Sequence, residues 1–299
     1  MINVSDLSYR YPKAVVDAVR GIGFSVDQGE VFGFLGPSGA GKSTTQKILM
    51  GSLVGYTGSA TVGGVQAGTA DGSFRSSIGV AFEFPCFYQK LTGMENLLLF
   101  ASMYAGQKDD PRVLLDRLGL GGAADRRVGE YSKGMKMRLN LARALVHRPR
   151  IVFLDEPTSG LDPANARTVR ELVLERAAGG AAVFLTTHDM AAADAMCDRV
   201  AFLVDGRIAA CDSPAALKRR YGRRAVVVEH EAPAVMIDRV ATEVAGGSAA
   251  GVQPEFPLDG LADNPAFLDE LRRPGLVGIR TLDASLDRIF LELTGKELA

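Results

Sequence analysis

Residues 36–44 have the composition of a phosphate-binding loop. They are Gly36, Pro37, Ser38, Gly39, Ala40, Gly41, Lys42, Ser43 and Thr44. Glycines allow the backbone to curl so that several N–H groups face phosphate oxygens. Lys42 brings a positive charge to the β- and γ-phosphates, and the hydroxyl of Ser43 can complete the shell of a Mg²⁺ ion. This G-x-x-x-x-G-K-[ST] spacing predicts a site for a nucleoside triphosphate.

The segments on either side of this loop must position it. The apolar run 31–35 predicts a buried strand, and a helix is expected to open at Lys42 and to continue to Leu49. The N-terminus of that helix adds its positive dipole end to the site. A glycine turn with an incidental lysine is the alternative explanation of the motif, and the strand before it and the helix after it argue against that alternative.

A second group of chemically capable residues follows two apolar runs further along the chain. Residues 151–154 predict a central parallel strand that delivers Asp155 and Glu156 at its C-terminal edge, where such sheets bind ligands. Asp155 suits a Mg²⁺ partner, and Glu156 suits a base or an orienting group for the attacking water. Residues 181–187 predict another buried strand that ends at His188. A purely structural histidine is the common alternative, but at this edge we expect His188 near the γ-phosphate.

Two further groups leave alternatives open. Tyr11 precedes the loop and can stack on a nucleotide base, although a tyrosine half-buried on a strand explains its position nearly as well. Ser132 and Gly134 lie at the start of a predicted helix, where a hydroxyl and an N–H group form an anion site. An ordinary N-cap is the alternative for that segment alone. Because the chain already has one phosphate loop, a second anion site must serve another nucleotide or another copy of the chain.

The rest of the first 222 residues reads as scaffold. Short antiparallel strands are expected within residues 1–30, and turns with short strands within 51–72. A buried strand at 78–82 stops at Pro85, and Thr92 with Glu95 forms a capping pattern. The remaining predicted elements are helices at 94–104, 111–118 and 164–176 and a hairpin at 200–209.

Composition excludes several classes of protein. A chain of 299 residues with 47% hydrophobic content can bury one main domain with an appendage. Its net charge of −1 provides no field to attract nucleic acid or anionic lipid, so we expect no nucleic acid partner. Neither a membrane-spanning stretch nor a signal-peptide profile is present. Cys86, Cys197 and Cys211 are too widely spaced to suggest a disulfide framework or a zinc site, and we expect a cytosolic protein.

With these motifs in this order, residues 1–222 resemble the nucleotide-binding subunit of an ABC transporter. Residues 36–44 match the Walker A motif and 151–155 the Walker B motif, with Glu156 as the catalytic glutamate. Residues 131–135 match the family's signature motif, in the Y-S-K-G-M form common among exporters. Residues 159–162, ending at Asp162, match the D-loop, His188 matches the switch histidine, and Tyr11 matches the aromatic residue that stacks on adenine.

The resemblance implies a fold, an activity and partners. The fold is an α/β P-loop NTPase, with a RecA-like parallel sheet, an antiparallel β-subdomain and a helical signature subdomain. The activity is hydrolysis of ATP with Mg²⁺. In this family two cassettes pack head to tail, so that Ser132 and Gly134 of one contact the γ-phosphate held by Lys42 of the other, here in a homodimer. Separate transmembrane permease subunits form the translocation path, which places the cassettes on the cytoplasmic face of the cell membrane.

One position departs from the common family pattern. Alignment of residues 91–97 places Glu83 where most cassettes carry the glutamine of the Q-loop. The segment around Glu83 looks like the E-loop variant of bacitracin- and lantibiotic-resistance cassettes. A carboxylate there can bind Mg²⁺ or its waters, and does so with a formal charge. The contact with the membrane partner, and with it the substrate class, is left open by this change.

Residues 223–299 extend beyond the cassette core and predict a small α+β accessory domain. A strand is expected at 225–229, and helices at 264–272 and 286–293. Residues 285–295 are similar to the ending of daunorubicin-type drug-export cassettes. A basic cluster spans the start of this region and either touches lipid or a partner or forms a solvated helix end. Its members are Lys218, Arg219, Arg220, Arg223 and Arg224.

The leading hypothesis is an ATPase subunit that drives export of a drug, antibiotic or peptide. The alternative is a soluble ABC-type ATPase that acts without a membrane partner, as in iron–sulfur assembly or translation. Translation factors of that kind carry two cassettes and this chain carries one, while the distance from Lys42 to Ser132 leaves no room for the coiled coil of DNA-repair members. A small-molecule kinase would share the phosphate loop but has no use for residues 131–135.

Overall fold

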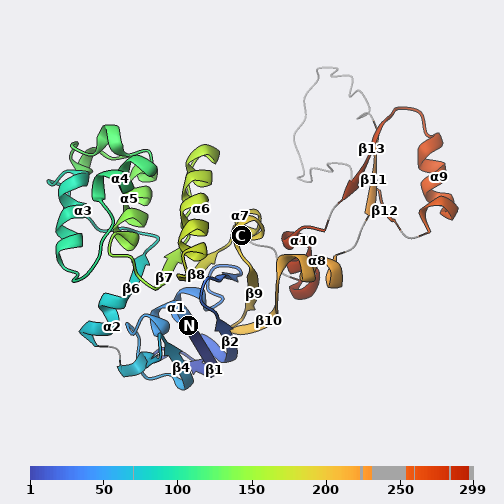
Figure 1. Cartoon of the computed structure of the whole chain (residues 1–299). Coiled ribbons are helices and arrows are strands. Elements are labelled where there is room, and N and C mark those ends of the chain that lie inside the picture. Colours follow the sequence, from blue (N-terminus) through green and yellow to red (C-terminus); the bar gives the residue numbers. More distant parts are fainter. Residues whose placement is uncertain (70, 223–224, 231–253, 259, 283, 296–299) are drawn as a thin grey trace, which may run out of the picture.

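The centre of the molecule is a six-stranded sheet in the order β10-β9-β3-β8-β7-β6 (Figure 1). The computed structural model describes all residues except 70, 223–224, 231–253, 259, 283 and 296–299. Every strand of this sheet is parallel to its neighbour except β10, which pairs antiparallel with β9. The strands are β3 (Val31–Leu35), β6 (Ile78–Ala81), β7 (Ile151–Asp155), β8 (Ala182–Thr187), β9 (Arg199–Val204) and β10 (Arg207–Asp212).

The central strands are buried along their whole length, as parallel strands covered on both faces must be. Every residue of β3 and of β8 is buried, which matches their continuous apolar sequence. In the register of the sheet, Leu35 lies opposite Thr187 and Asp155 lies opposite Thr186. The polar residues that end β7 and β8 therefore meet at the edge where the phosphate loop leaves β3.

A second, antiparallel sheet supports the central one and confirms the strands expected near the N-terminus. Its order is β2-β1-β4-β5. Phe24 of β2 packs on Phe32 of β3 and Phe184 of β8, with ring centroids 5.2 Å and 5.8 Å apart. The strands are β1 (Ile2–Tyr9), β2 (Val19–Val26), β4 (Thr57–Val62) and β5 (Val65–Gln66), and the helices α1 (Lys42–Leu49) and α2 (Gly72–Ser77) belong to the same half of the chain.

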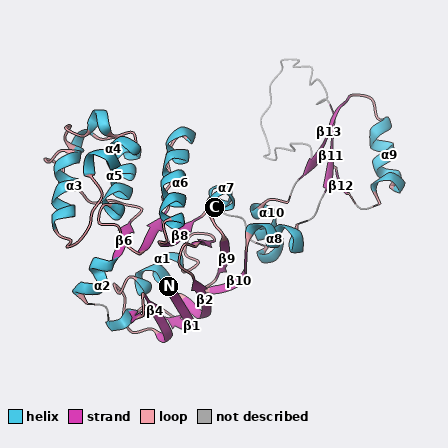
Figure 2. Ribbon diagram, in the orientation of Figure 1, coloured by secondary structure: helices cyan, strands magenta, loops and turns pink. Residues whose placement is uncertain are grey.

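Three helices gather on one side of the sheet (Figure 2). They are α3 (Gly93–Ser102), α4 (Pro111–Arg117) and α5 (Lys133–Leu145). The capping box expected from Thr92 and Glu95 is present at the start of α3, which ends at Ser102, two residues earlier than the sequence indicated. Arg138 of α5 donates to the carbonyl of Leu118 after α4, at 2.7 Å. The helices α6 (Pro163–Ala178) and α7 (Met190–Met196) follow β7 and β8.

The C-terminal region contains a small sheet and two helices that return to the cassette. The sheet has the order β12-β11-β13, and α9 covers one face of it through Phe267. Its elements are β11 (Ala225–His230), β12 (Glu255–Pro257), α9 (Pro265–Arg272) and β13 (Leu276–Leu282). The helices α8 (Pro214–Tyr221) and α10 (Leu286–Thr294) lie between this sheet and the cassette (Figure 1).

The last helix, α10, is part of the main hydrophobic core. Leu286, Ile289 and Phe290 are each about 1% exposed and belong to the same buried cluster as the central sheet. The ring of Phe290 meets the ring of Phe202 on β9 edge to face, with centroids 5.5 Å apart. The chain thus leaves the cassette after α8, forms the small sheet, and comes back to complete the cassette's core.

The basic residues of α8 lie in its last turn, which supports their interpretation as a solvated helix end. Lys218 pairs with Asp194 at 2.5 Å, and Arg219 and Arg220 are exposed. Arg223 and Arg224 lie outside the described residues. No helix within the described part of the chain is long and apolar enough to cross a bilayer.

Candidate functional site

The phosphate loop requires glycine at two positions that the sequence motif also fixes. Gly41 immediately precedes α1 with φ 109°, and a Cβ atom there would lie 2.4 Å from the carbonyl oxygen of Ala18. Gly36 has φ 152°, and a Cβ atom there would lie 2.2 Å from the carbonyl oxygen of Leu203. Any larger residue would collide with backbone, so these contacts fix the path of the loop.

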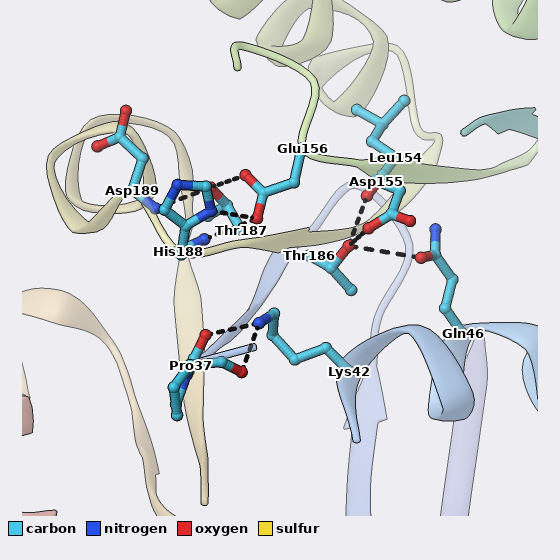
Figure 3. Close-up of polar contacts among 11 residues, drawn as sticks. Pro37, Lys42, Gln46, Leu154, Asp155, Glu156, Thr186, Thr187, His188 and Asp189 are labelled. Carbon is cyan, nitrogen blue, oxygen red and sulfur yellow. Dashed lines mark hydrogen bonds and ion pairs between the residues drawn. The ribbon is translucent and has the colours of Figure 1, made fainter. Parts of the chain in front are cut away.

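The ammonium group of Lys42 is held by the loop itself. Its Nζ atom donates to the carbonyl oxygens of Gly36 at 2.6 Å and of Pro37 at 3.0 Å (Figure 3). Burial lowers the pKa of Lys42, and the nearby carboxylates of Glu156, Asp155 and Glu83 oppose that shift. The charge is therefore placed at the mouth of the loop, where it can meet phosphate oxygens.

A cleft of about 300 Å³ brings most of the predicted residues together. It joins the phosphate loop with the ends of β6, β7 and β8, as expected for ligands at the carboxyl edge of a parallel sheet. Its lining residues are Ser38, Gly39, Gly41, Lys42, Ser43, Thr44, Glu83, Asp155, Glu156 and His188. Ala40 is buried behind the loop and donates its N–H to the carbonyl of Pro37 at 3.2 Å.

Three side chains in this cleft have the chemistry to bind Mg²⁺. Ser43, Glu83 and Asp155 supply a hydroxyl and two carboxylates, the hard oxygen donors that Mg²⁺ prefers. Burial raises the pKa of Asp155, and a hydrogen bond from the hydroxyl of Thr186 opposes that shift. Within the described residues, no group of three or more His, Cys, Asp and Glu side chains can hold a metal alone. The donor set fits a Mg²⁺ ion that completes its shell with phosphate and water oxygens.

Glu156 is the most tightly held carboxylate of the site. Its Oε1 atom accepts from the backbone N–H of His188 at 2.9 Å and from Nδ1 of His188 at 2.7 Å (Figure 3). Its Oε2 atom accepts from the hydroxyl of Thr187 at 2.9 Å. Glu156 also has φ 49°, an uncommon conformation for a residue other than glycine that is often found at functional sites. The carboxylate is thereby fixed at the sheet edge facing the cleft.

Ser132, Gly134 and Asp162 lie together at another place. Within the described part of the chain, the residues that line the cleft do not include any of these three. Ser132 is the N-cap of α5 and accepts from the N–H of Met135 at 3.2 Å. A Cβ atom at Gly134 would lie 3.2 Å from Leu161, next to Asp162, which caps α6. The signature segment and the D-loop turn therefore form one surface that is separate from the cleft of the same chain.

Tyr11 lies beside the phosphate loop. Its hydroxyl is 3.2 Å from the hydroxyl of Thr44, and its ring meets that of Tyr9 edge to face with centroids 5.0 Å apart. Tyr11 is 37% exposed, so part of its ring faces solvent next to the site. Stacking on a base remains a prediction for this residue.

Sequence reasoning missed the threonines that hold the two carboxylates. Thr186 bonds Asp155 and also lies 3.4 Å from Oε1 of the buried Gln46, while Thr187 bonds Glu156. Both threonines end a strand that is otherwise apolar and lies next to β7 in the sheet. The sequence could have indicated these contacts, because two polar residues at the end of a buried strand need hydrogen-bond partners at the same edge of the sheet.

Comparison with known proteins agrees with this geometry. The family model described as "ABC transporter" matches residues 19–159. A fluoroquinolones export ATP-binding protein of Mycobacterium tuberculosis is 51% identical over 299 residues, covering 100% of this chain and 94% of that protein. A daunorubicin resistance ATP-binding protein of Streptomyces coeruleorubidus is 36% identical, covering 93% and 90% of the two chains.

A solved structure supports the fold. A dimeric ATP-binding cassette bound to ADP and phosphate superimposes with a TM-score of 0.64 at 24% identity, covering 71% of this chain and 98% of that one. The P-loop NTPase fold predicted from the sequence is confirmed, as is the similarity to drug-export cassettes. The chain belongs to the ABC transporter family, as an ATP-binding subunit and ATPase homologous to ATP-binding proteins of drug export.

Proposed function

We propose that this chain hydrolyses Mg-ATP in the cleft and uses the energy to drive export through separate membrane-spanning subunits. Lys42 and the N–H groups of residues 36–44 bind the β- and γ-phosphates, and Tyr11 stacks on adenine. Ser43, Asp155 and Glu83 bind the metal, directly or through water. When bound there, a Mg²⁺ ion would supply positive charge to offset the negative charge that develops on the phosphates.

Glu156 is proposed to orient the attacking water. Thr187 and His188 hold its two oxygens, so the carboxylate needs little reorganisation when the water moves toward the γ-phosphate. His188 is more exposed than Glu156, with side-chain exposures of 52% and 10%, which leaves its imidazole free to contact the γ-phosphate. These roles are the ones that the family resemblance implies for these positions.

The proposed active assembly is a head-to-tail homodimer. ABC cassettes dimerise, and the position of Ser132 and Gly134 on a surface separate from the cleft supports that arrangement here. The N-terminus of α5 provides N–H groups and a positive dipole end for the γ-phosphate bound by Lys42 of the second copy. Asp162, next to this surface, contributes the D-loop contact between the two copies.

A groove beside Glu83 supports coupling to a membrane partner, and this observation carries the export proposal. The groove has a volume of about 440 Å³ and is lined by Phe82, Phe84, Phe100 and Tyr104, among others. Phe84 is 76% exposed and Phe82 is 44% exposed. Glu83, between them in the chain, lines the ATP cleft instead. A partner seated in the groove therefore contacts the same segment that reaches the nucleotide.

The chain is proposed to lie on the cytoplasmic face of the cell membrane, attached through its permease subunits. We assign residues 1–222 to the ATPase domain and residues 223–299 to an accessory domain, except that helix α10 packs into the core of the ATPase domain. The homology to drug-export ATP-binding proteins favours a drug or antibiotic as the cargo, which the permease selects.

A pull-down from gently solubilised native membranes tests this function. Tagged Glu156→Gln protein with Mg-ATP should recover a multi-spanning membrane protein in near-equal amount. Phe84→Asp should abolish that recovery, because it replaces an exposed aromatic ring of the groove with a carboxylate. Val113→Asp is the matched control, since Val113 is a 54% exposed apolar residue on α4 outside the groove. Recovery of soluble proteins alone would favour an ATPase without a membrane partner.

A further inference from the structure

The segment that carries Glu83 is held at both of its ends by one helix. Asn140 of α5 donates from Nδ2 to the carbonyl oxygen of Phe82 at 2.7 Å. Arg143 of α5 donates from Nη1 to the carbonyl oxygen of Cys86 at 2.9 Å. The two bonds bracket residues 82–86, with Glu83 immediately after the first of them.

The two side chains also fix each other. Nη2 of Arg143 donates to Oδ1 of Asn140 at 2.6 Å, which directs the NH₂ group of Asn140 toward Phe82. The guanidinium of Arg143 lies 4.9 Å from the ring centroids of both Phe87 and Phe100. Asn140 is 1% exposed, so its amide has no water to replace a lost partner. The side chains of Asn140 and Arg143 are therefore held in one arrangement by their mutual hydrogen bond and their surroundings.

The strand that leads into this segment is pressed against the same helix. A Cβ atom at Gly79 of β6 would lie 2.1 Å from the carbonyl oxygen of Ala144, so backbone approaches backbone there. Such close packing leaves β6 and α5 no freedom to slide past each other. The start of the segment 82–86 is therefore fixed closely against α5.

We propose that Asn140 and Arg143 are positioning residues that set the place of the Glu83 carboxylate at the metal site. The helix that supplies them starts at Ser132, its N-cap. The same helix therefore joins the surface proposed to meet the second copy to the two residues that hold the segment carrying Glu83. This inference rests on the proposed function, since it takes Glu83 as a metal-binding group.

The test measures metal dependence of nucleotide binding, without turnover. All proteins carry Glu156→Gln, and a fluorescent ATP analogue is titrated with Mg²⁺ to find the half-saturating concentration. Glu83→Gln should raise that concentration about tenfold, with near-normal nucleotide affinity at saturating Mg²⁺. Asn140→Leu, which keeps the volume but removes both hydrogen bonds, should raise it by a similar factor.

The decisive result comes from the double variant. If Asn140 acts through Glu83, Glu83→Gln with Asn140→Leu should bind Mg²⁺ no more weakly than Glu83→Gln alone. Arg138→Met is the control, because Arg138 is also a buried polar residue of α5 but bonds the carbonyls of Leu118 and Gly119. It should leave the Mg²⁺ requirement within about twofold of the parent.

Two results would overturn the proposal in different ways. An unchanged Mg²⁺ requirement in Glu83→Gln would remove the metal role of Glu83, and with it both that part of the proposed function and this inference. A changed requirement in Glu83→Gln with no change in Asn140→Leu, or with strictly additive effects, would overturn the inference alone. If Asn140→Leu does not fold, as judged by its melting temperature, Arg143→Lys replaces it, since lysine cannot bond Cys86 and Asn140 in the same fork geometry.

Discussion

The Nδ1 atom of His188 lies 2.7 Å from the Oε1 atom of Glu156, an oxygen that also accepts the backbone N–H of His188. An ionised carboxylate can only accept, so the proton of this contact belongs to Nδ1 and the Nε2 atom is left for other partners. The end of β8 thus orients the acid at the end of β7. The groups of Thr187 and His188 that bond the carboxylate of Glu156 are all hydrogen-bond donors. The role of Glu156 therefore depends on its negative charge.

Glu156→Gln should bind ATP and hydrolyse it at least about 100-fold more slowly, because an amide is a poor base and a poor orienting group for water. Phosphate release measures turnover, and light scattering after size exclusion measures mass. The variant should accumulate as a dimer with saturating Mg-ATP. A monomer under those conditions would contradict the head-to-tail assembly, while unimpaired hydrolysis would contradict the role of Glu156.

Lys42→Ala should weaken ATP binding and reduce turnover by about 100-fold or more, because it removes the charge at the β- and γ-phosphates. Equilibrium binding of a fluorescent ATP analogue and steady-state hydrolysis measure the two effects. Lys47→Ala is the matched control, since Lys47 is an exposed lysine on the same helix outside the cleft. Equal losses in both variants would show that general charge, rather than the position of Lys42, matters.

Asp155→Asn should raise the melting temperature of the nucleotide-free protein at pH 7 by about 2 °C or more, and should weaken its affinity for Mg-ATP. Burial raises the pKa of Asp155 in the folded protein above its ordinary 3.8. At a pH above that raised pKa, the ionised carboxylate lowers the free energy of unfolding, and this destabilisation disappears as the pH falls. The increase in melting temperature caused by Asp155→Asn should therefore become smaller as the pH is lowered.

Asp162→Asn is the control for that experiment. Hydrogen bonds from Asn165 lower the pKa of Asp162, so its charge contributes stability above the ordinary pKa that is lost as the pH falls. This variant should not raise the melting temperature at pH 7. A rise in both variants would mean that removing negative charge, rather than relieving its burial, stabilises the protein.

Asp109→Ala should lower the free energy of unfolding by about 2 kcal/mol, because it leaves a partly buried arginine without its partner. Asp109 accepts from Nε of Arg148 at 2.5 Å and also pairs with Arg176 of α6, whose side chain is 18% exposed. Urea denaturation measures the change. Glu171→Ala should cost less than about 0.5 kcal/mol, because its pair with Arg167 is solvent-exposed. Similar costs for the two variants would contradict this reasoning.

The sequence was sufficient for the parts of the site that depend on local pattern. The phosphate loop lies between β3 and α1 as expected, because glycine spacing and a following helix are encoded within residues 31–49. Asp155 ends β7, and Glu156 and His188 directly follow β7 and β8, as expected, because carboxyl ends of parallel strands meet at one edge. The N-cap of Ser132 is also present.

Contacts between distant segments could not be read in this way. Asn140 sits within an ordinary amphipathic helix, and only the fold brings it to Phe82. The helix α7 was missed because it is short and alanines surround its buried face, so that face does not stand out in the sequence, and its capping residue Asp189 stood beside His188. The strands β12 and β13 were missed because their pairing with β11 joins segments that are distant in the sequence.

Because α10 packs into the main core, the cassette cannot complete that core until α10 has been synthesised. Phe290 packs on Phe202, but a ribosome makes it long after the strands of the central sheet. At roughly 5–20 residues per second, several seconds separate Tyr221 from Leu286, and the nascent cassette spends them with this part of its core exposed. Full stability, and with it resistance to proteolysis and readiness to pair, is therefore reached only after the small C-terminal sheet has been synthesised.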